Sequence, residues 1–239
     1  MNDPTPPLLR ADGIFHRRTP TEELNGVSVT IEPGRFTLLS GGPESGTGAL
    51  LRILGLLERA DGGEVWIDGR GTSGLDDAAR LELRNRFFGF LFAEPFLLDS
   101  FTVAENVAMP LFKIGCVDIE AARARTAEVL EFAALGGVAD MPVEDLGALD
   151  RHKVSLARAV AISPRVLIAE DVALHLPAED ARGFAELVRN VPEALGIGVI
   201  ATSPMEAEIF GADRVIRLER GVIVADSQPE PAQEARAHE

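Results

Sequence analysis

Short segments rich in apolar residues predict a series of β-strands along this chain. In residues 27–31, apolar side chains alternate with Ser28 and Thr30, the period-two pattern of a strand with one buried face. The Pro33-Gly34 pair that follows predicts a turn. Further predicted strand segments are Phe36–Ser40, Glu64–Asp68, Phe87–Phe92, Val166–Ala169, Gly198–Thr202 and a hairpin over Arg214–Ala225. The segments that are apolar throughout are typical of strands buried in a parallel sheet.

Other segments repeat their apolar residues at helical spacing. In residues 119–133 these residues fall on one helical face, with Asp118 as a suitable N-cap and Gly136-Gly137 as a stop. Ala49–Leu57 and Val154–Ile162 predict two more helices. Strands and helices together predict an α/β core that contains a helical insertion.

The order of these elements predicts how the chain is divided. The α/β core is expected to comprise residues 8–92 and 163–226, with a helical subdomain inserted at residues 93–162. Residues 1–7 are polar and proline-rich, which predicts a loose arm. Residues 227–239 have the composition of a disordered tail.

Charge and composition limit the possible partners. The 239-residue chain has a formal net charge of −15, which opposes binding to phosphate backbones, so we predict no nucleic-acid partner. Its most apolar window, 87–98, is shorter than the about 20 apolar residues that a membrane-spanning helix needs. The N-terminus does not have the features of a signal peptide. The single Cys116 and the absence of a Cys/His cluster predict a cytosolic protein without a disulfide or a metal centre.

A glycine-rich segment, Gly41–Gly48, lies between a predicted strand and a predicted helix, as in phosphate-binding units. The phosphate-loop pattern is G-x-x-x-x-G-K-[ST], and both of its glycines are present here. Thr47, however, stands at the lysine position, Gly48 stands at the position of the metal-binding hydroxyl, and Glu44 adds a negative charge. Two interpretations remain, a working phosphate site and a tight strand-to-helix turn, and the substitutions favour the turn.

With these elements placed, the chain resembles the ABC ATPase family over about residues 8–226. The resemblance rests on three long collinear stretches, Leu51–Gly69, Phe88–Leu111 and Lys153–Asp171. It is greatest to the branch that serves lipoprotein-release and macrolide-export permeases, whose "LLP-LT-xENV-xPL" pattern is similar to the second stretch. The resemblance implies a P-loop NTPase-like core, with a mainly parallel sheet flanked by helices and an antiparallel β part, plus an inserted helical subdomain.

The resemblance also implies which residues correspond to the family's nucleotide site. Family members bind ATP and Mg²⁺ at the phosphate loop. The equivalent residues here are Gly41, Gly42, Pro43, Glu44, Ser45, Gly46, Thr47, Gly48 and Ala49. Because the lysine and the hydroxyl are missing, we predict neither ATP nor Mg²⁺ as a cofactor of this chain.

The family's catalytic positions are also substituted, so we predict no catalytic residue. The family's Asp-Glu pair, which serves the metal and the attacking water, is replaced by Glu170-Asp171 in reverse order. Ala93 replaces the glutamine of the switch loop, and Ser203 replaces the histidine of the switch strand. Arg18 aligns with the family's adenine-stacking aromatic residue, and the chain contains no tyrosine.

The family's signature motif, LSGGQ, caps the γ-phosphate held by the opposite subunit. The equivalent residues here are Leu146, Gly147, Ala148, Leu149 and Asp150. Asp150 is expected at a helix start, where its carboxylate would satisfy the free backbone N–H groups and repel phosphate. The signature is therefore predicted not to function.

An apolar cluster follows Ala93 and includes Phe96, Leu97 and Phe101, with Phe92 and Leu98 beside them. In the family, this region and the helical subdomain receive a coupling helix of the permease. Phe96, Leu97 and Phe101 are therefore the candidate docking residues for any exposed part of the cluster, whereas we expect most of the cluster to be core of the helical subdomain.

Three functions remain open at this point. The first is a non-hydrolysing cassette that docks an integral-membrane permease, at the inner face of the membrane, or pairs with another cassette as a homodimer or heterodimer. The second is a functional ATPase subunit that energises export or lipoprotein release. A family dimer builds each ATP site from one chain's phosphate loop and the other chain's signature, and both are altered here. The third is a soluble regulatory scaffold unconnected to transport, since fold alone does not fix function.

Overall fold

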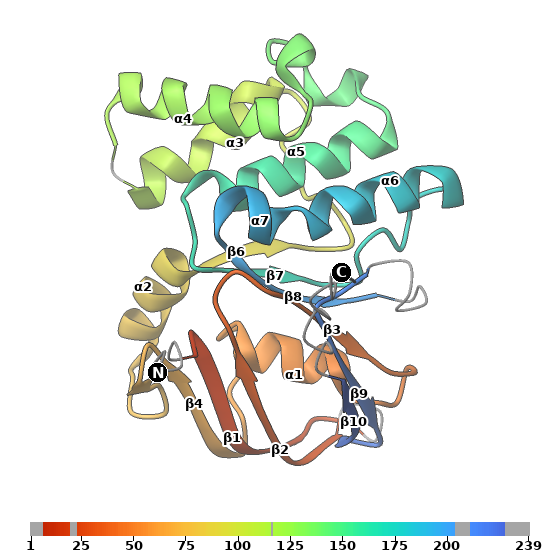
Figure 1. Cartoon of the computed structure of the whole chain (residues 1–239). Helices are drawn as coiled ribbons and strands as arrows, with labels where there is room; N and C mark the ends of the chain where they lie inside the picture. Colours follow the sequence, from red (N-terminus) through yellow and green to blue (C-terminus); the bar gives the residue numbers. More distant parts are fainter. Residues whose placement is uncertain (1–6, 20–22, 116, 204–210, 228–239) are drawn as a thin grey trace, which may run out of the picture.

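A computed structural model describes residues 7–19, 23–115, 117–203 and 211–227. Helices α3 (Val103–Pro110), α4 (Ile119–Phe132) and α5 (Ala148–Ala161) gather at one end of the molecule (Figure 1). Strands β1 (Leu9–Arg17), β2 (Glu23–Ile31) and β4 (Gly62–Ile67) lie with helix α1 (Thr47–Leu54) toward the other end. A six-stranded sheet runs between these two parts. Within the described residues, no helix is long and apolar enough to cross a membrane.

The six-stranded sheet has the order β10-β9-β3-β8-β7-β6. Its strands are β3 (Phe36–Ser40), β6 (Phe88–Leu91), β7 (Val166–Ala169), β8 (Gly198–Thr202), β9 (Arg214–Glu219) and β10 (Val222–Ser227). All neighbouring pairs are parallel except β9 and β10, which form an antiparallel hairpin. The predicted bounds of β3, β7 and β8 are confirmed, as is the predicted hairpin that starts at Arg214, which turns at Arg220-Gly221.

A second, antiparallel sheet has the order β2-β1-β4-β5. Its strands are β1 (Leu9–Arg17), β2 (Glu23–Ile31), β4 (Gly62–Ile67) and β5 (Arg70–Gly71). Helix α1 (Thr47–Leu54) packs against both sheets through fully buried side chains such as Leu50 and Leu51, which share a core with Ile14 and Ile216. The predicted α/β fold, with its parallel sheet and antiparallel part, is confirmed.

The helical end contains α3 (Val103–Pro110), a π-helical turn at Leu111–Gly115, α4 (Ile119–Phe132) and α5 (Ala148–Ala161). Asp118 caps α4 as predicted, since its side chain accepts a hydrogen bond from the Ala121 N–H at 2.8 Å. The helices pack on one another through a second core cluster that includes Val107, Val129 and Val154.

Several elements differ from the predictions. Helix α5 begins at Ala148 and not at Val154, because the polar run at residues 150–153 interrupts the apolar repeat near its start. Helix α1 ends at Leu54 and not at Leu57, because the chain turns at Gly55 and Leu56 has a φ of +58°. The elements that were not predicted are β1, β5, α2 (Asp77–Phe87), α3, α6 (Ala178–Arg189) and α7 (Val191–Leu195).

The predictions for the chain ends are tested only in part. The arm at residues 1–6 and the tail at residues 228–239 lie outside the described residues. Ser227, predicted as the first residue of the tail, instead belongs to β10, where its hydroxyl donates to the Val215 carbonyl oxygen at 3.2 Å.

Candidate functional site

The loop between β3 and α1 forms the tight turn of a phosphate loop. A Cβ added at Gly41 would lie 2.4 Å from the Ser45 Cβ, and one added at Gly46 would lie 2.6 Å from the Glu23 carbonyl oxygen. Gly46 also has a φ of +86°, in the left-handed region that favours glycine. The two framing glycines are therefore required by the turn itself, whatever the loop binds.

Polar groups inside this loop bond to one another. The buried Ser45 donates its N–H to the Gly42 carbonyl oxygen at 2.9 Å, and its own carbonyl oxygen accepts the Gly221 N–H at 3.0 Å. The Ser45 hydroxyl oxygen lies 3.1 Å from the Thr47 hydroxyl oxygen and accepts the Thr47 N–H at 3.3 Å. Thr47 thus points its short hydroxyl back into the loop and cannot replace the reach of a lysine.

A pocket of about 470 Å³ opens beside the loop. Its lining residues are Leu39, Gly41, Gly42, Pro43, Gly46, Thr47, Gly48, Ala49, Arg52, Glu170, Asp171, Thr202 and Ser203. The structure therefore brings the phosphate loop together with both acids and with Ser203. Two loop residues, Glu44 and Ser45, are not part of this lining; Glu44 is exposed, and the hydroxyl of Ser45 is turned into the loop.

The two acids at the end of β7 are held differently. Asp171 has a φ of +47°, its N–H donates to the Thr202 hydroxyl oxygen at 2.9 Å, and its carboxylate accepts the Thr202 O–H at 3.2 Å. Glu170 instead forms an ion pair with Arg52 of α1, with 3.3 Å between the carboxylate oxygen and Nη1. Ser203 donates its hydroxyl to the Val172 carbonyl oxygen at 3.4 Å. Each of these side chains thus has a partner within the chain.

Arg52 was not identified from the sequence, although it lies at the centre of this site. Its Nε is 3.3 Å from the Glu58 carboxylate, and the same carboxylate forms an ion pair with Arg18. Arg18, predicted at the adenine-stacking position, is therefore engaged by Glu58. An ion-pair network runs from Arg18 through Glu58 and Arg52 to Glu170.

The side chains that line this pocket offer few of the oxygen ligands that Mg²⁺ requires. This ion prefers octahedral oxygen ligands. Gly48 offers no side-chain oxygen, and the carboxylate of Glu170 already faces a guanidinium. In the described ranges there is no group of three or more His, Cys, Asp or Glu residues that could hold a metal ion. The residues present do not fit a bound Mg²⁺.

Ala93 lies in the switch loop that leaves β6, and it does not line the phosphate-loop pocket described here. This loop is held by two side chains of α5 that sequence analysis missed. The ring nitrogens of the buried His152 lie 3.1 Å from the Ala93 carbonyl oxygen and 2.8 Å from the Ala148 carbonyl oxygen. Arg158 donates to the carbonyl oxygens of Pro95 and Phe96, both at 2.7 Å.

The signature-equivalent residues form the start of α5, and none of Leu146–Asp150 lies among the described residues that line the pocket. Asp150 lies in the first turn of α5, but the prediction that its carboxylate caps the helix is wrong. Gly147 is the N-cap, no described side chain caps the helix, and Asp150 is its third residue. From there its carboxylate pairs with Lys153, one turn further on, at 3.1 Å. The free N–H groups of the helix start are thus not satisfied by Asp150.

The apolar cluster after Ala93 lies largely at the surface. Phe96 is 69% exposed and Phe101 43% exposed, and Leu98 is also exposed, whereas Leu97 packs against the core of the helical part. The expectation that most of the cluster is core is therefore wrong for these three exposed residues. The reason is that the loop leaves β6 and runs over the surface, with Phe92 stacked on Phe90 and edge-on to Phe96.

Close to this cluster, a groove of about 450 Å³ separates the edge strand β6 from the helical end. Its lining residues are Asn85, Phe88, Gly89, Phe90, Met109, Pro110, Lys113, Ile114, Arg158, Ala159 and Ile162. Arg158 therefore both lines the groove and holds the loop that carries Phe96.

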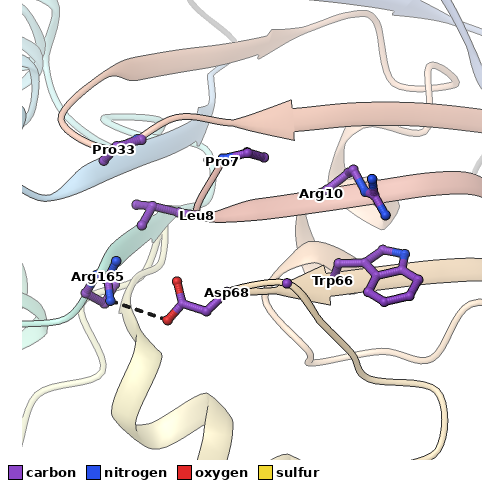
Figure 2. Close-up of a pocket in the computed structure, with 8 residues that line it drawn as sticks. Pro7, Leu8, Arg10, Pro33, Trp66, Asp68 and Arg165 are labelled. Atoms are coloured by element: carbon purple, nitrogen blue, oxygen red, sulfur yellow. Dashed lines mark hydrogen bonds and ion pairs between the residues drawn. The ribbon is translucent and has the colours of Figure 1, made fainter. Parts of the chain in front are cut away.

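Another pocket, of about 530 Å³, lies beside β1 and β4 (Figure 2). Arg165 faces Asp68 there at 3.3 Å, and the Arg10 guanidinium lies 5.1 Å from the centre of the Trp66 ring (Figure 2). Arg10 also pairs with Asp12 at 3.0 Å, so both cations are already matched by a carboxylate. No residue predicted to be functional lines this pocket, and we do not assign it a role.

Comparisons with known proteins agree with this fold. The ABC transporter family profile matches residues 24–173. The chain is 31% identical, over 221 residues, to lipoprotein-releasing system ATP-binding protein LolD 1 of Rhodopseudomonas palustris, covering 90% of this chain and 98% of that protein. It is 33% identical to methionine import ATP-binding protein MetN of Rhizobium johnstonii, covering 92% of this chain but only 61% of MetN.

A solved structure agrees as well. The dimeric post-hydrolysis state of the ATP-binding cassette MJ0796, bound to ADP and Pi, superposes with a TM-score of 0.80 at 26% identity, covering 93% of this chain and 99% of that one. The chain therefore belongs to the ABC transporter family, as an ATP-binding-cassette subunit similar to the LolD proteins.

Proposed function

We propose that this chain is a non-hydrolysing cassette, which docks an integral-membrane permease or pairs with an active cassette. The observation that carries the proposal is the pocket beside the phosphate loop. It has no lysine at residue 47 and no hydroxyl at residue 48, and its first acid is paired with Arg52. A phosphoryl-transfer site depends on such charges to stabilise the transferred group, so losing them together removes both binding and catalysis.

Pairing with an ordinary cassette would not restore two working sites. In the family dimer, each ATP site combines one chain's phosphate loop with the other chain's signature. In this chain, Ala148 and Leu149 add side chains at the signature, and Asp150 places a carboxylate in the first turn of α5. A carboxylate there opposes an incoming phosphate. Both sites of a heterodimer would therefore be impaired.

Titration of the purified protein with Mg·ATP tests the proposal. We expect no saturable binding up to millimolar nucleotide by calorimetry, and phosphate release no faster than in a protein-free control. The physical reason is the joint loss of the lysine, the metal ligand and the signature. A dissociation constant in the low micromolar range with measurable turnover would instead support the alternative, a working ATPase that energises export or lipoprotein release.

The groove beside β6 and the exposed Phe96 and Phe101 support a role in permease docking. An exposed aromatic side chain next to an apolar groove is typical of a surface that receives an amphipathic helix. Such docking would place the cassette at the inner face of the membrane through its partner. Phe96, Phe101 and the partly buried Leu97 remain the proposed docking residues.

Phe96→Asp and Phe101→Asp are expected to abolish co-purification with an integral-membrane partner from native membranes. The melting temperature should change little, since both side chains are exposed. Phe15→Asp is the matched control, because Phe15 is 53% exposed on β1 and far in sequence from the groove. If wild-type pull-downs recover no integral-membrane protein at all, the docking role fails and a soluble scaffold becomes the better explanation.

A further inference from the structure

The guanidinium of Arg52 occupies the space between the residues at which the family would hold its metal. Arg52 follows Gly48 by one helical turn, so its side chain lies over the same face of α1. A Cβ added at Gly48 would lie only 3.2 Å from Arg52 Nη1, and that same Nη1 is 3.3 Å from the Glu170 carboxylate. The cation is thus between the hydroxyl position and the first acid.

The position of the Arg52 side chain is therefore linked to the absence of a side chain at residue 48. A serine or threonine at residue 48 would bring its Cβ to 3.2 Å from Arg52 Nη1, so the guanidinium would have to move by a few tenths of an ångström. The glycine that removes the metal-binding hydroxyl thus also leaves the guanidinium in its present position beside Glu170.

Both carboxylates that contact Arg52 lie in a partly buried environment. The side chains of Arg52, Glu58 and Glu170 are 21%, 18% and 25% exposed. Charges in such positions are screened less by salt than surface charges are, so each acid needs a nearby cation. The planar fork of a guanidinium can serve two carboxylates at once, and it ties the C-terminal end of β7 to α1 and to Glu58.

We propose that the guanidinium of Arg52 takes the place of the divalent metal in this pocket. The charge of Glu170 is then compensated without a metal ion. This proposal assigns a role to one residue of the non-hydrolysing cassette, and it rests on that proposed function. A divalent ion entering the pocket would have to displace the guanidinium from Glu170, without a hydroxyl ligand at residue 48. Any oxyanion that binds at the loop would meet a guanidinium and not a metal.

Metal rescue of an Arg52 variant tests the proposal. Arg52→Met removes the guanidinium and its charge, keeps an unbranched apolar stem, and leaves Glu58 and Glu170 without this cation. We expect its melting temperature to fall by roughly 3–6 °C. Millimolar Mn²⁺ should recover part of that loss, because the carboxylate of Glu170 can now accept a cation, and it should leave the wild-type melting temperature unchanged.

A second variant and a control sharpen the test. In Arg52→Met with Gly48→Ser, the restored hydroxyl should tighten Mn²⁺ binding, measured by electron paramagnetic resonance, at least about tenfold relative to wild type. Arg59→Met is the control, since Arg59 pairs with Asp77 at 2.7 Å outside the pocket. It should show no Mn²⁺ rescue.

Two results would overturn the role of Arg52, namely Mn²⁺ stabilising the wild type as much as Arg52→Met, or neither variant gaining Mn²⁺ affinity. These results are independent of the test of the proposed function. If wild type binds ATP equally well with Mg²⁺ and with EDTA, the expectation of no nucleotide binding fails while the metal-independent pocket stands. If wild type binds no ATP and the Arg52 variants gain no metal affinity, the proposed role of Arg52 fails while the expectation of no nucleotide binding stands.

Discussion

Replacing Thr47 by Lys and Gly48 by Ser is expected to give this cassette measurable affinity for Mg·ATP. The lysine would supply a charge-assisted hydrogen bond to the phosphates, and the serine would supply an oxygen ligand for the metal. Charge-assisted hydrogen bonds contribute about 1.5–3 kcal/mol each, so two new interactions correspond to roughly 10²–10⁴ in affinity. Calorimetric titration of the double variant beside the wild type measures this gain.

The position of Arg52 makes this prediction more specific. A serine Cβ at residue 48 would meet Arg52 Nη1 at 3.2 Å, and Glu170 would still be paired with that arginine. The double variant should therefore reach only part of the gain. Adding Arg52→Met should give the tightest binding of the series, because it frees Glu170 for the metal.

Turnover should stay close to background in both variants. Ala93, Asp150 and Ser203 still differ from the groups that position water and stabilise the transferred phosphate. Such groups act together, and restoring some of them does not restore a proportional share of the rate. Hydrolysis at the rate of an ordinary cassette in the double variant would mean that these three positions matter far less than we infer.

The parts of the fold that could be predicted from the sequence are those with a local signal. Strands β3, β7 and β8 are short apolar runs that end at a glycine or a polar residue, so their bounds were predicted correctly. Strand β1 was missed because the period-two pattern breaks at a bulge, where the register shifts between Ala11 and Ile14. The buried positions are Leu9 and Ala11 before the bulge and Ile14 and His16 after it, so a strict alternation does not hold over the nine residues.

The positions of the phosphate loop and the acids could also be predicted, because each follows a recognisable strand. What could not be predicted is which cationic side chain pairs with the acids. Arg52 and Glu170 are 118 residues apart, and the sequence of α1 gives no indication that its arginine contacts the end of β7. His152 and Arg158 were missed for the same reason, since their partners are carbonyl oxygens of a distant loop.

The error over Asp150 comes from a helix boundary. The apolar repeat of α5 is clear only from Val154 onward, so the residues before the polar run at 150–153 were not recognised as part of the helix. A shift of the start by a few residues changes a predicted capping carboxylate into a first-turn residue that pairs with Lys153. Element ends therefore limit any argument about a side chain at a helix terminus.

Loss of the Arg158 guanidinium is expected to destabilise the switch loop strongly. Arg158 makes two charge-assisted hydrogen bonds of 2.7 Å to adjacent carbonyl oxygens, and burial lowers the pKa of its guanidinium. One of these carbonyls belongs to Phe96, whose φ of +45° is unfavourable for a residue with a side chain. The arginine thus holds an exposed aromatic residue in a strained backbone conformation.

Arg158→Ala should cost about 2–4 kcal/mol, because it removes both hydrogen bonds and leaves the loop free to relax. For a chain of this length, the melting temperature should then fall by roughly 5–15 °C in a thermal scan. Arg158→Lys should recover part of the loss, since one ammonium cannot match the fork of a guanidinium. Arg123→Ala, at an exposed position of α4, is the control and should change the melting temperature little.

The same variant separates loop geometry from side-chain identity in permease docking. Arg158→Ala retains Phe96 but removes the contacts that fix its direction, so co-purification of the partner should be lost although the aromatic ring is present. Phe96→Gly in the wild-type background removes the ring and suits the positive φ, so it should abolish docking without lowering the melting temperature. If Arg158→Ala unfolds at the wild-type temperature and still recovers the partner, the guanidinium does not hold this loop.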